Sequence, residues 1–388
     1  MRGPRSAVVA VTMACQSRCT MCDIWQYGRG PEMTPADYRR LPRSLREVNI
    51  SGGEPFLRKD LPELVNAIRA HIPGVRVIIS TNALMPARIE QQMDKMRGVG
   101  LRVSIDGIGH VDDVTRGIPG GYDKAVDTLR RLQAAGHTDL GISGTVSREA
   151  VGELPKLKTL AEEMGVEFVC SVAQSSETYF GNQEDAFPWD GRQTVVENLI
   201  DVRDRQLASP RLKDWFRAYY TDGLIDYVYR RKRRLFCHAG DEMIYLNPEG
   251  DVYPCNALNR KMGNILEDSY DVIHARSADV LQDVKTCPVD CWMSCTVAPA
   301  MRKSPWVPGL WLVMAKFLGI GKQAKVADSA LPPRPVVRVP VTLIAPAPPL
   351  TALVAAGAED FDAAPDAPAA MHPTTLGARD QAACESST

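Results

Sequence analysis

The sequence has no excess of charge of either sign. Among 388 residues, 46 basic side chains are balanced by 47 acidic ones, and the net charge is −1. A protein that binds nucleic acid mainly through phosphate contacts needs a surplus of Lys and Arg. The balance therefore argues against a bulk nucleic-acid binder. The one basic run, residues 230–234, is expected to be the solvated face of a helix.

Long uninterrupted hydrophobic stretches and internal repeats are also missing. A membrane-spanning helix needs about 20 apolar residues in a row. The nearest candidate, residues 305–322, is shorter and contains Gly, Pro and Lys316. We expect a terminal helix that packs on the core. The alternative is an interfacial helix in contact with a membrane surface, anchored by Trp306 and Trp311.

Cysteine is not scarce, but its distribution does not fit a disulfide framework. Nine of the ten cysteines precede residue 300, and eight of them fall into two groups. Disulfide frameworks are typical of small secreted domains, and this chain is too large and too rich in core residues to need one. Clustered cysteines in an intracellular enzyme more often hold metal. The sequence therefore predicts a cytoplasmic metalloprotein.

Strand-like and helix-like stretches alternate over the first half of the chain. The predicted strands are residues 7–14, 45–55, 75–83, 101–107, 140–147 and 166–173. The predicted helices are residues 35–42, 61–72, 87–100, 122–136 and 154–165. Six strand–helix units favour a parallel sheet with helices outside it, but they are too few for a closed eight-stranded barrel. The predicted fold is α/β, a partial (β/α)6 TIM-like barrel with ligands at the carboxyl ends of the strands.

The first cysteine group consists of Cys15, Cys19 and Cys22, spaced as CxxxCxxC. No fourth Cys or His follows at the local spacing of a zinc finger, so a structural zinc ion would need a distant fourth ligand. Iron–sulfur clusters normally take four thiolates. Three thiolates leave one iron of a four-iron cluster open, and an open iron can bind a small chelating molecule. The spacing therefore favours such a cluster over zinc.

Polar and glycine-rich motifs follow the next strands in order. They are SGGEP at residues 51–55, STNA at 80–83, SIDG at 104–107 and HVDDVTRG at 110–117. Paired glycines allow the backbone to approach a ligand closely. Together with CxxxCxxC, this ordered set resembles the radical S-adenosylmethionine (SAM) superfamily over roughly residues 7–300.

The resemblance implies both the cofactors and their sites. Cys15, Cys19 and Cys22 would hold a [4Fe-4S] cluster whose open iron is chelated by the amino and carboxylate groups of SAM. The residues expected to contact SAM are Gly52, Gly53, Glu54, Pro55, Asn82, Ser104 and Asp106. Reduction of the cluster would break the bond between the sulfonium and C5′ of SAM. The resulting 5′-deoxyadenosyl radical would then take a hydrogen atom from the substrate.

Several of these side chains also have a simpler explanation. Asp106 and Asn82 could each cap the turn after its strand. Arg116 could pair with Asp112 or Asp113 at the surface. Their order behind the cysteine motif favours contact with SAM.

The second cysteine group begins with Cys237 and Cys255, spaced as C-x12-G-x4-C. Cys287, Cys291 and Cys295 follow as CxxxCxxxC. The group is similar to the twitch/SPASM type of extension, which carries auxiliary iron–sulfur clusters, although its second half departs from the full SPASM pattern. Five thiolates suffice for one auxiliary [4Fe-4S] cluster, and Cys237 and Cys255 are the expected ligands. Cys287, Cys291 and Cys295 are the candidates for the remaining ligand positions of the cluster. The alternative is a zinc ribbon.

Other residues are assigned by their surroundings. Cys170 lies among apolar neighbours and is expected to be a buried, inert thiol. Sulfatase-maturing relatives place an acidic base straight after the cysteine that matches Cys255, and Asn256 stands there instead, so that activity is not expected. The candidate bases elsewhere are Glu167, Glu177 and Tyr179.

The expected organisation has four parts. They are a core barrel at 1–230, an auxiliary-cluster domain at 231–300, a terminal apolar helix at 301–325 and a disordered Pro/Ala-rich tail at 326–388. The first strand begins near residue 7, so no room is expected for a preceding peptide-recognition domain. That favours a small-molecule substrate, or a peptide delivered by a partner.

The resemblance implies an oxidoreductase, because a fully ligated auxiliary cluster can accept an electron from a substrate radical. The substrate would be a small metabolite or a peptide, and a flavodoxin or ferredoxin would supply the reducing electron. One alternative is a redox-neutral rearrangement or group transfer with a structural auxiliary cluster. The other is a zinc-binding protein without enzymatic activity.

Overall fold

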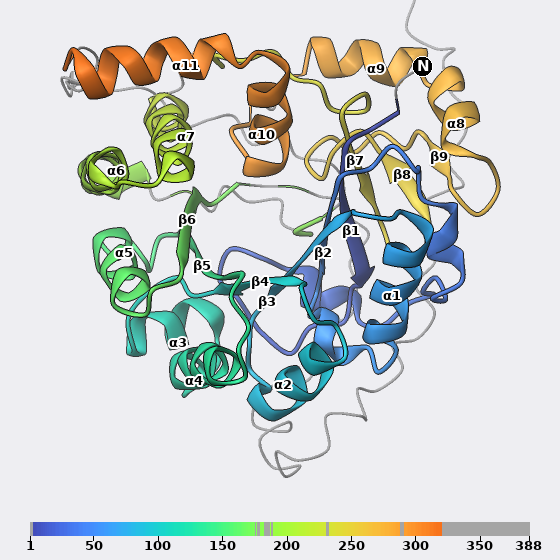
Figure 1. Ribbon diagram of the computed structural model, residues 1–388, viewed down its shortest axis with the longest axis horizontal. Helices are drawn as coiled ribbons and strands as arrows, with labels where there is room; N and C mark the ends of the chain where they lie inside the picture. The colour runs from blue at the N-terminus through green and yellow to red at the C-terminus, as the bar shows by residue number, and fades with distance from the viewer. Residues whose placement is uncertain are drawn as a thin grey trace, which may run out of the picture. The chain divides into compact units, whose positions relative to one another are not determined.

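The computed structural model describes residues 3–319 except 175, 177–178, 182–186, 188, 230–232 and 288–290. The predicted tail at 326–388 lies outside the described residues. Within them, nine strands form one sheet in the order β6-β5-β4-β3-β2-β1-β7-β8-β9 (Figure 1).

All six predicted strands are present, and each pairs in parallel with the next. They are β1 (Ser6–Thr12), β2 (Glu47–Gly52), β3 (Arg76–Thr81), β4 (Gly100–Ser104), β5 (Leu140–Val146) and β6 (Glu167–Val172). Every residue of β1 is buried, because helices and loops cover both faces of a parallel sheet. A continuous apolar run is therefore the expected signature of this strand.

The connecting helices lie outside the strands (Figure 1). They are α1 (Leu61–His71), α2 (Pro86–Asp94), α3 (His110–Arg116), α4 (Gly121–Ala134) and α5 (Leu154–Glu163). α1 buries Leu61, Leu64, Val65 and Ile68, which recur at the spacing of one helix face. α4 ends at Ala134, and Gly136 follows its C-cap residue with a φ of 83°, a conformation that favours glycine.

The connection between β1 and β2 lacks the predicted helix at 35–42. Only a 3-10 turn, η2 (Asp37–Arg40), forms there; η1 (Ile24–Tyr27) precedes it, and η3 (Pro55–Leu57) follows β2. Leu41 takes an extended conformation because Pro42 follows it, and a residue before proline disfavours the helical region. The segment between two prolines is too short for a stable α-helix.

The second half of the chain begins with helices and returns to the sheet. Its helices are η4 (Trp189–Gly191), α6 (Arg192–Ala208), α7 (Leu212–Val228), α8 (Tyr270–Arg276), α9 (Ala278–Lys285), α10 (Ser294–Lys303), α11 (Trp306–Leu312) and the π-helical η5 (Val313–Phe317). Its strands are β7 (Met243–Leu246), β8 (Asp251–Tyr253) and β9 (Gly263–Asn264). β7 pairs in parallel with β1, and β8 and β9 follow antiparallel. The cysteine-rich segment thus extends the core sheet, which the sequence does not reveal.

The predicted terminal helix packs on α7. Trp311 of α11 lies edge-on to Tyr219, with ring centroids 5.5 Å apart. Trp306, by contrast, is 67% exposed. In the part of the chain that the structure describes, none of the helices combines the length and the apolar character that a membrane span requires.

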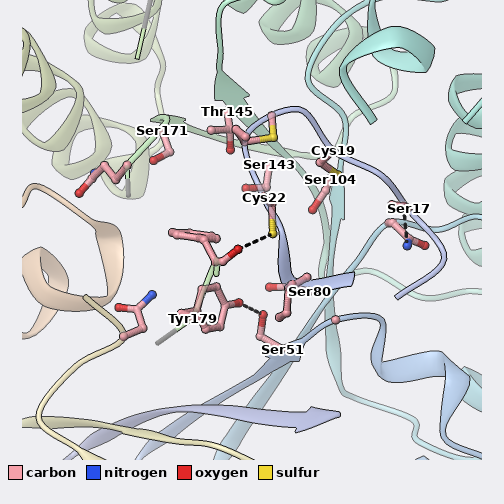
Figure 2. Close-up of a pocket in the computed structure, with 18 of the residues that line it drawn as sticks. Ser17, Cys19, Cys22, Ser51, Ser80, Ser104, Ser143, Thr145, Ser171 and Tyr179 are labelled. Atoms are coloured by element: carbon pink, nitrogen blue, oxygen red, sulfur yellow. Dashed lines mark hydrogen bonds between the residues drawn. The ribbon is translucent and has the colours of Figure 1, made fainter. Parts of the chain in front are cut away.

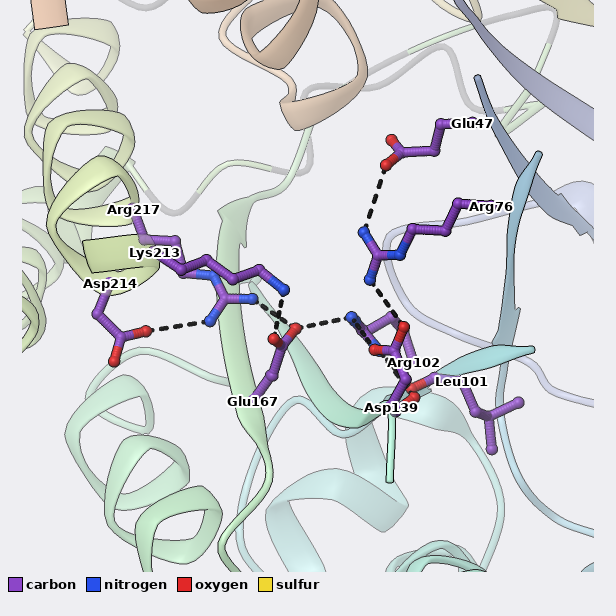
Figure 3. Close-up of polar contacts among 9 residues, drawn as sticks. All are labelled: Glu47, Arg76, Leu101, Arg102, Asp139, Glu167, Lys213, Asp214 and Arg217. Carbon is purple, nitrogen blue, oxygen red and sulfur yellow. Dashed lines mark hydrogen bonds and ion pairs between the residues drawn. The ribbon is translucent and has the colours of Figure 1, made fainter. Parts of the chain in front are cut away.

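An ionic network closes the amino ends of the strands (Figure 3). It joins four carboxylates to four cations: Glu47, Asp139, Glu167 and Asp214 to Arg76, Arg102, Lys213 and Arg217. Glu167 is the first residue of β6 and pairs with three of these cations. The hypothesis that Glu167 is a catalytic base is therefore wrong, because its carboxylate lies at the end of the strand opposite the carboxyl ends.

Replacing Asp139 by Asn should lower the free energy of unfolding by about 1 kcal/mol at neutral pH, after allowance for partial exposure. Burial alone would raise the pKa of Asp139, but Arg76 and Arg102 outweigh it and lower the pKa from 3.8 to about 2. The stabilisation is therefore complete above pH 3.8 and lost as pH falls through about 2. Urea unfolding at several pH values measures it. A stability difference that persists unchanged below pH 2 would contradict the electrostatic origin.

Candidate active site

A cavity of about 300 Å³ lies at the carboxyl ends of the parallel strands. Its walls carry a row of hydroxyl groups from successive strands, labelled in Figure 2: Ser51, Ser80, Ser104, Ser143, Thr145 and Ser171. Cys15, Cys19 and Cys22 line it from the loop after β1. The second cysteine group reaches the same cavity through Cys295. The tertiary structure therefore brings the two cysteine groups to one space.

The cysteine loop is held from two sides. The backbone N–H groups of Arg18 and Thr20 donate to carbonyls of α3, at 2.9 Å each. From the other side, Asn82 Nδ2 donates to Ser17 Oγ at 2.9 Å and lies 3.8 Å from Cys15 Sγ. Asn82 Oδ1 also accepts from the Leu84 N–H, which is the predicted turn cap. Asn82 thus caps its turn and orients the first cysteine.

All three thiols are free and partly buried. Burial raises the pKa of Cys15, Cys19 and Cys22, in the last case to about 12. As free thiols they would keep their protons at neutral pH, so a metal centre must displace the protons when it binds. Cys15, Cys19 and Cys22 come from one loop and line the cavity together, while the other cysteine that lines it, Cys295, belongs to the second group. Three thiolates from one loop fit a cluster with one open iron.

The paired glycines let the turn after β2 approach another group closely, as predicted, but that group is the backbone of the cysteine loop. A Cβ on Gly52 would lie 2.2 Å from the Thr12 carbonyl oxygen, and one on Gly53 would lie 2.1 Å from the Ala14 carbonyl oxygen. Both distances are far shorter than real contacts. The N–H of Gly53 donates to Thr12 O at 2.8 Å. Gly52 and Gly53 therefore seat the turn after β2 directly against the backbone that carries Cys15, and they line the cavity as well.

Glu54 and Pro55 lie behind this wall rather than on it. The fully buried Glu54 carboxylate accepts from the N–H groups of Phe56 and Asn82 and from the hydroxyl of Thr81, at 2.8–3.0 Å. Burial outweighs these hydrogen bonds and raises the pKa of Glu54 to about 7. Every oxygen of Glu54 thus has a protein partner, and the carboxylate ties the β2 turn to the β3 turn.

Replacing Glu54 by Ala should lower the free energy of unfolding by about 3 kcal/mol, since it strands buried donors of Phe56, Thr81 and Asn82. The exposed Glu63 of α1 supplies the control, because Glu63→Ala removes a carboxylate without stranding a partner. Urea unfolding of the protein as purified compares the two. Equal losses for both variants would show that the Glu54 contacts carry little stability.

Arg116 is buried with two carboxylates and not paired at the surface. Its guanidinium lies 2.9 Å from Asp106 and 3.5 Å from Asp112, and both carboxylates are almost fully buried. Asp113 instead accepts from the N–H groups of Gly120 and Tyr122 at the start of α4. Burial raises the pKa of Asp112 to about 6. The alternative explanation is thus right about Asp112 as a partner of Arg116 but wrong about the surface location, because α3 turns Arg116 inward, where Nη1 lies 4.0 Å from Cys19 Sγ.

Ser104 and Asp106 both line the cavity, as the resemblance implies. Asp106 also accepts from the Thr145 N–H at 2.7 Å, so it bridges β4 and β5. Thr145, Ser143 and Ser171 were not among the predicted site residues. Their signal is present in the sequence: each is a small polar residue at an inward position late in an otherwise apolar strand.

Tyr179 lines the cavity next to Ser51 (Figure 2), and both Cys22 and Cys295 act electrostatically on it. Its hydroxyl forms a hydrogen bond with Ser51, and its ring packs edge-on against Tyr245 with centroids 5.6 Å apart. Burial raises the pKa of Tyr179 to about 12. Tyr179 is thus a phenol at neutral pH and suits proton donation better than the predicted role of base. Glu177, the remaining candidate base, lies outside the described residues.

The second cysteine group gathers around the ends of β7 and β8. Burial raises the pKa of Cys237, Cys255 and Cys295, and neighbouring cysteines add to the rise in each case; for Cys295 it reaches about 12. Cys291 is one of those neighbours for all three. Cys291 therefore lies near each of the other three thiols, and the four together are candidate ligands for one thiolate-bound metal centre. Asn256 lines the cavity beside Cys295, whose thiol donates to Asn256 Oδ1 at 3.3 Å.

The basic run is not a solvated helix face where the structure describes it. α7 ends at Val228, and the side chains of Arg233 and Arg234 turn inward. Arg234 pairs with Asp222 and Asp226. Arg233 contacts Cys291. The prediction fails because buried acceptors on two different elements lie within reach of these guanidinium groups.

Comparison with known protein families finds a match for the core and another for the second cysteine group. Residues 9–148 match the model of the radical SAM superfamily, and residues 237–296 match that of an iron–sulfur cluster-binding domain, SPASM. Read with the two cysteine groups at one cavity, these matches define an iron–sulfur enzyme. The chain belongs to the radical SAM superfamily and carries a SPASM-type domain. A [4Fe-4S] cluster, SAM and an auxiliary iron–sulfur cluster are the cofactors that these domains imply.

Two curated relatives cover much of the chain. Mycofactocin maturase MftC of Mycolicibacterium smegmatis is 31% identical over 270 residues, 66% of this chain and 66% of the relative. PqqA peptide cyclase of Xanthomonas axonopodis pv. citri is 25% identical over 317 residues, 79% of this chain and 78% of the relative. The matched region thus spans just under two thirds of the length of the maturase.

Two solved structures share the fold. Streptococcus suis SuiB bound to its precursor peptide SuiA superposes with a TM-score of 0.53 at 18% identity, over 71% of this chain and 65% of SuiB. Native anSMEcpe with bound AdoMet gives 0.55 at 12% identity, over 80% of this chain and 99% of that protein. The predicted α/β partial barrel is thereby confirmed as the fold of the core.

Proposed function

We propose that this protein is a radical SAM oxidoreductase that modifies a peptide, with its auxiliary cluster as electron acceptor. The observation that carries the proposal is the single cavity bordered by Cys15, Cys19 and Cys22 on one side and by Cys295 on the other. The cluster and SAM together supply a 5′-deoxyadenosyl radical that abstracts a hydrogen atom. A substrate in this cavity would lie next to both centres, so an electron could pass from it to the auxiliary cluster.

The site residues fall into three groups, according to the cofactor that each group is proposed to hold. Cys15, Cys19 and Cys22 hold the first cluster. Gly52, Gly53, Asn82 and Ser104 form the wall beside it where SAM binds, with Glu54, Pro55 and Asp106 as its supports. Cys237, Cys255, Cys291 and Cys295 hold the auxiliary cluster, and Cys287 is the competing candidate for one of the four positions. The choice of Cys291 is supported by its electrostatic effect on each of the other three thiols.

A peptide substrate is supported from two directions. PqqA peptide cyclase is named for a peptide, and the SuiB structure that shares the fold holds the precursor peptide SuiA. Among the described residues that line the cavity, only Asp106 and Arg116 are charged, and they pair with each other. A wall of hydroxyl groups suits neutral polar groups such as backbone amides. This revises the sequence-based preference for a small molecule.

The test is anaerobic reconstitution with iron and sulfide, followed by SAM and dithionite. We expect 5′-deoxyadenosine, measured by liquid chromatography. With short peptides encoded beside the gene as substrates, we expect a product lighter by two hydrogen atoms. An unchanged peptide mass with continued consumption of SAM would favour the redox-neutral alternative. Absence of the nucleoside would contradict radical chemistry itself. A flavodoxin or ferredoxin should replace dithionite.

A further inference from the structure

Arg233 lies directly against Cys291 of the second cysteine group. Its Nη1 donates to the Cys291 carbonyl at 2.7 Å and lies 3.8 Å from Cys291 Sγ. The same guanidinium donates to the hydroxyl and the carbonyl of Thr296, at 3.1 Å each, and to the Leu235 carbonyl at 2.8 Å. Its carbon lies 5.5 Å from the centre of the Trp292 ring. The guanidinium is therefore fixed in one orientation against the loop that carries Cys291.

The charge of Arg233 has no carboxylate partner among the described residues. The neighbouring Arg234, by contrast, forms ion pairs with two carboxylates, those of Asp222 at 2.7 Å and of Asp226. A partly buried cation whose contacts are carbonyls, a hydroxyl and a sulfur calls for an anion nearby. The groups that can supply it are the thiolates of Cys237, Cys291 and Cys295. Arg233 in turn lowers the pKa of Cys237 and Cys295, although their burial acts more strongly in the opposite direction.

We propose that Arg233 is a positioning residue that supplies the counter-charge of the auxiliary cluster and raises its reduction potential. This rests on the auxiliary cluster of the proposed function. Iron–sulfur potentials respond to nearby charge and to hydrogen bonds to the sulfurs. A cluster gains one negative charge on reduction, so a fixed positive charge beside a ligand sulfur stabilises the reduced form more than the oxidised form. Arg233 would thereby make the cluster a better acceptor of the substrate's electron.

The experiment isolates the auxiliary cluster in the full chain by replacing Cys15, Cys19 and Cys22 with Ala. In this background, three variants separate charge from packing. Arg233→Gln removes the positive charge. Arg233→Lys keeps the positive charge but loses the planar guanidinium with its several N–H donors. Arg302→Gln removes an exposed charge from α10, the helix that carries Cys295. A redox titration followed by electron paramagnetic resonance gives the midpoint potential of each.

We expect Arg233→Gln to shift the potential to more negative values. A tenfold loss of relative affinity for the reduced form corresponds to about 59 mV for one electron. Arg233→Lys should stay near the parent and Arg302→Gln should match it. If Arg233→Gln fails to retain iron while Arg233→Lys retains it, the charge is still supported.

Two results would overturn the proposal. One is an unchanged potential in Arg233→Gln with full iron content. The other is equal loss of iron from Arg233→Gln and Arg233→Lys, which would assign Arg233 a purely structural role. Neither measurement uses turnover, so both are independent of the proposed reaction. If the background protein with Arg233 intact binds no iron, the auxiliary cluster itself is absent, and the proposed function fails with it.

Discussion

Replacing Cys19 by Ala should reduce the release of 5′-deoxyadenosine from SAM to background. Cys19 is one of three cavity-lining thiols, and no other described cysteine lines the cavity beside them except Cys295 from the second group. The substitution removes one of the three thiolates, so the first cluster keeps only two of the four ligands that such clusters normally take. The loss is therefore expected to be complete rather than partial, as for groups that act as one unit.

Cys170→Ala provides the matched control for that experiment. Cys170 is 1% exposed on β6, where its thiol lies 3.8 Å from the Thr221 hydroxyl, and it does not line the cavity. Removing it should leave iron content and nucleoside release close to those of the parent. Anaerobic assay with SAM and dithionite measures both variants. Retained nucleoside release in Cys19→Ala would show that the first cluster is held by other residues.

The second large effect is expected from Cys255→Ala, which should separate cleavage of SAM from oxidation of the substrate. Cys255 is buried at the end of β8, next to Cys291 and Cys295. Its loss should remove the auxiliary cluster, so that bound iron falls from about eight to about four atoms per chain. Nucleoside release should continue, because Cys15, Cys19 and Cys22 are untouched. The product lighter by two hydrogen atoms should disappear.

Cys287→Ala tests the ligand set in the same experiment. The proposed ligands are Cys237, Cys255, Cys291 and Cys295, and with these four intact the Cys287→Ala variant should retain its iron and its product. Iron analysis and mass spectrometry of the peptide give both readouts. If Cys287→Ala loses iron as Cys255→Ala does, Cys287 is a ligand. If Cys255→Ala still forms the oxidised product, the auxiliary cluster is not the electron acceptor.

The strands of the core were predictable because their signal is local. Every residue of β1 is buried and its centre is an unbroken apolar run, because a strand that is covered on both faces requires apolar side chains on both faces. The helix predicted at 35–42 failed for a local reason as well, since Pro42 prevents Leu41 from continuing a helix. Glu167 failed for a reason that is not local. Its place at the start of β6 was visible, but the cations around it come from β4 and α7.

Three properties follow from the sequence alone: the CxxxCxxC cluster motif, the parallel α/β core and the presence of a second cysteine group. Each depends on residues that are near one another along the chain. The tertiary structure decided that β7 pairs with β1, that Cys295 reaches the cavity of Cys15, Cys19 and Cys22, and that Arg233 meets Cys291. These contacts join residues far apart in sequence. Spacing cannot encode them, because they depend on how the sheet and its covering segments pack.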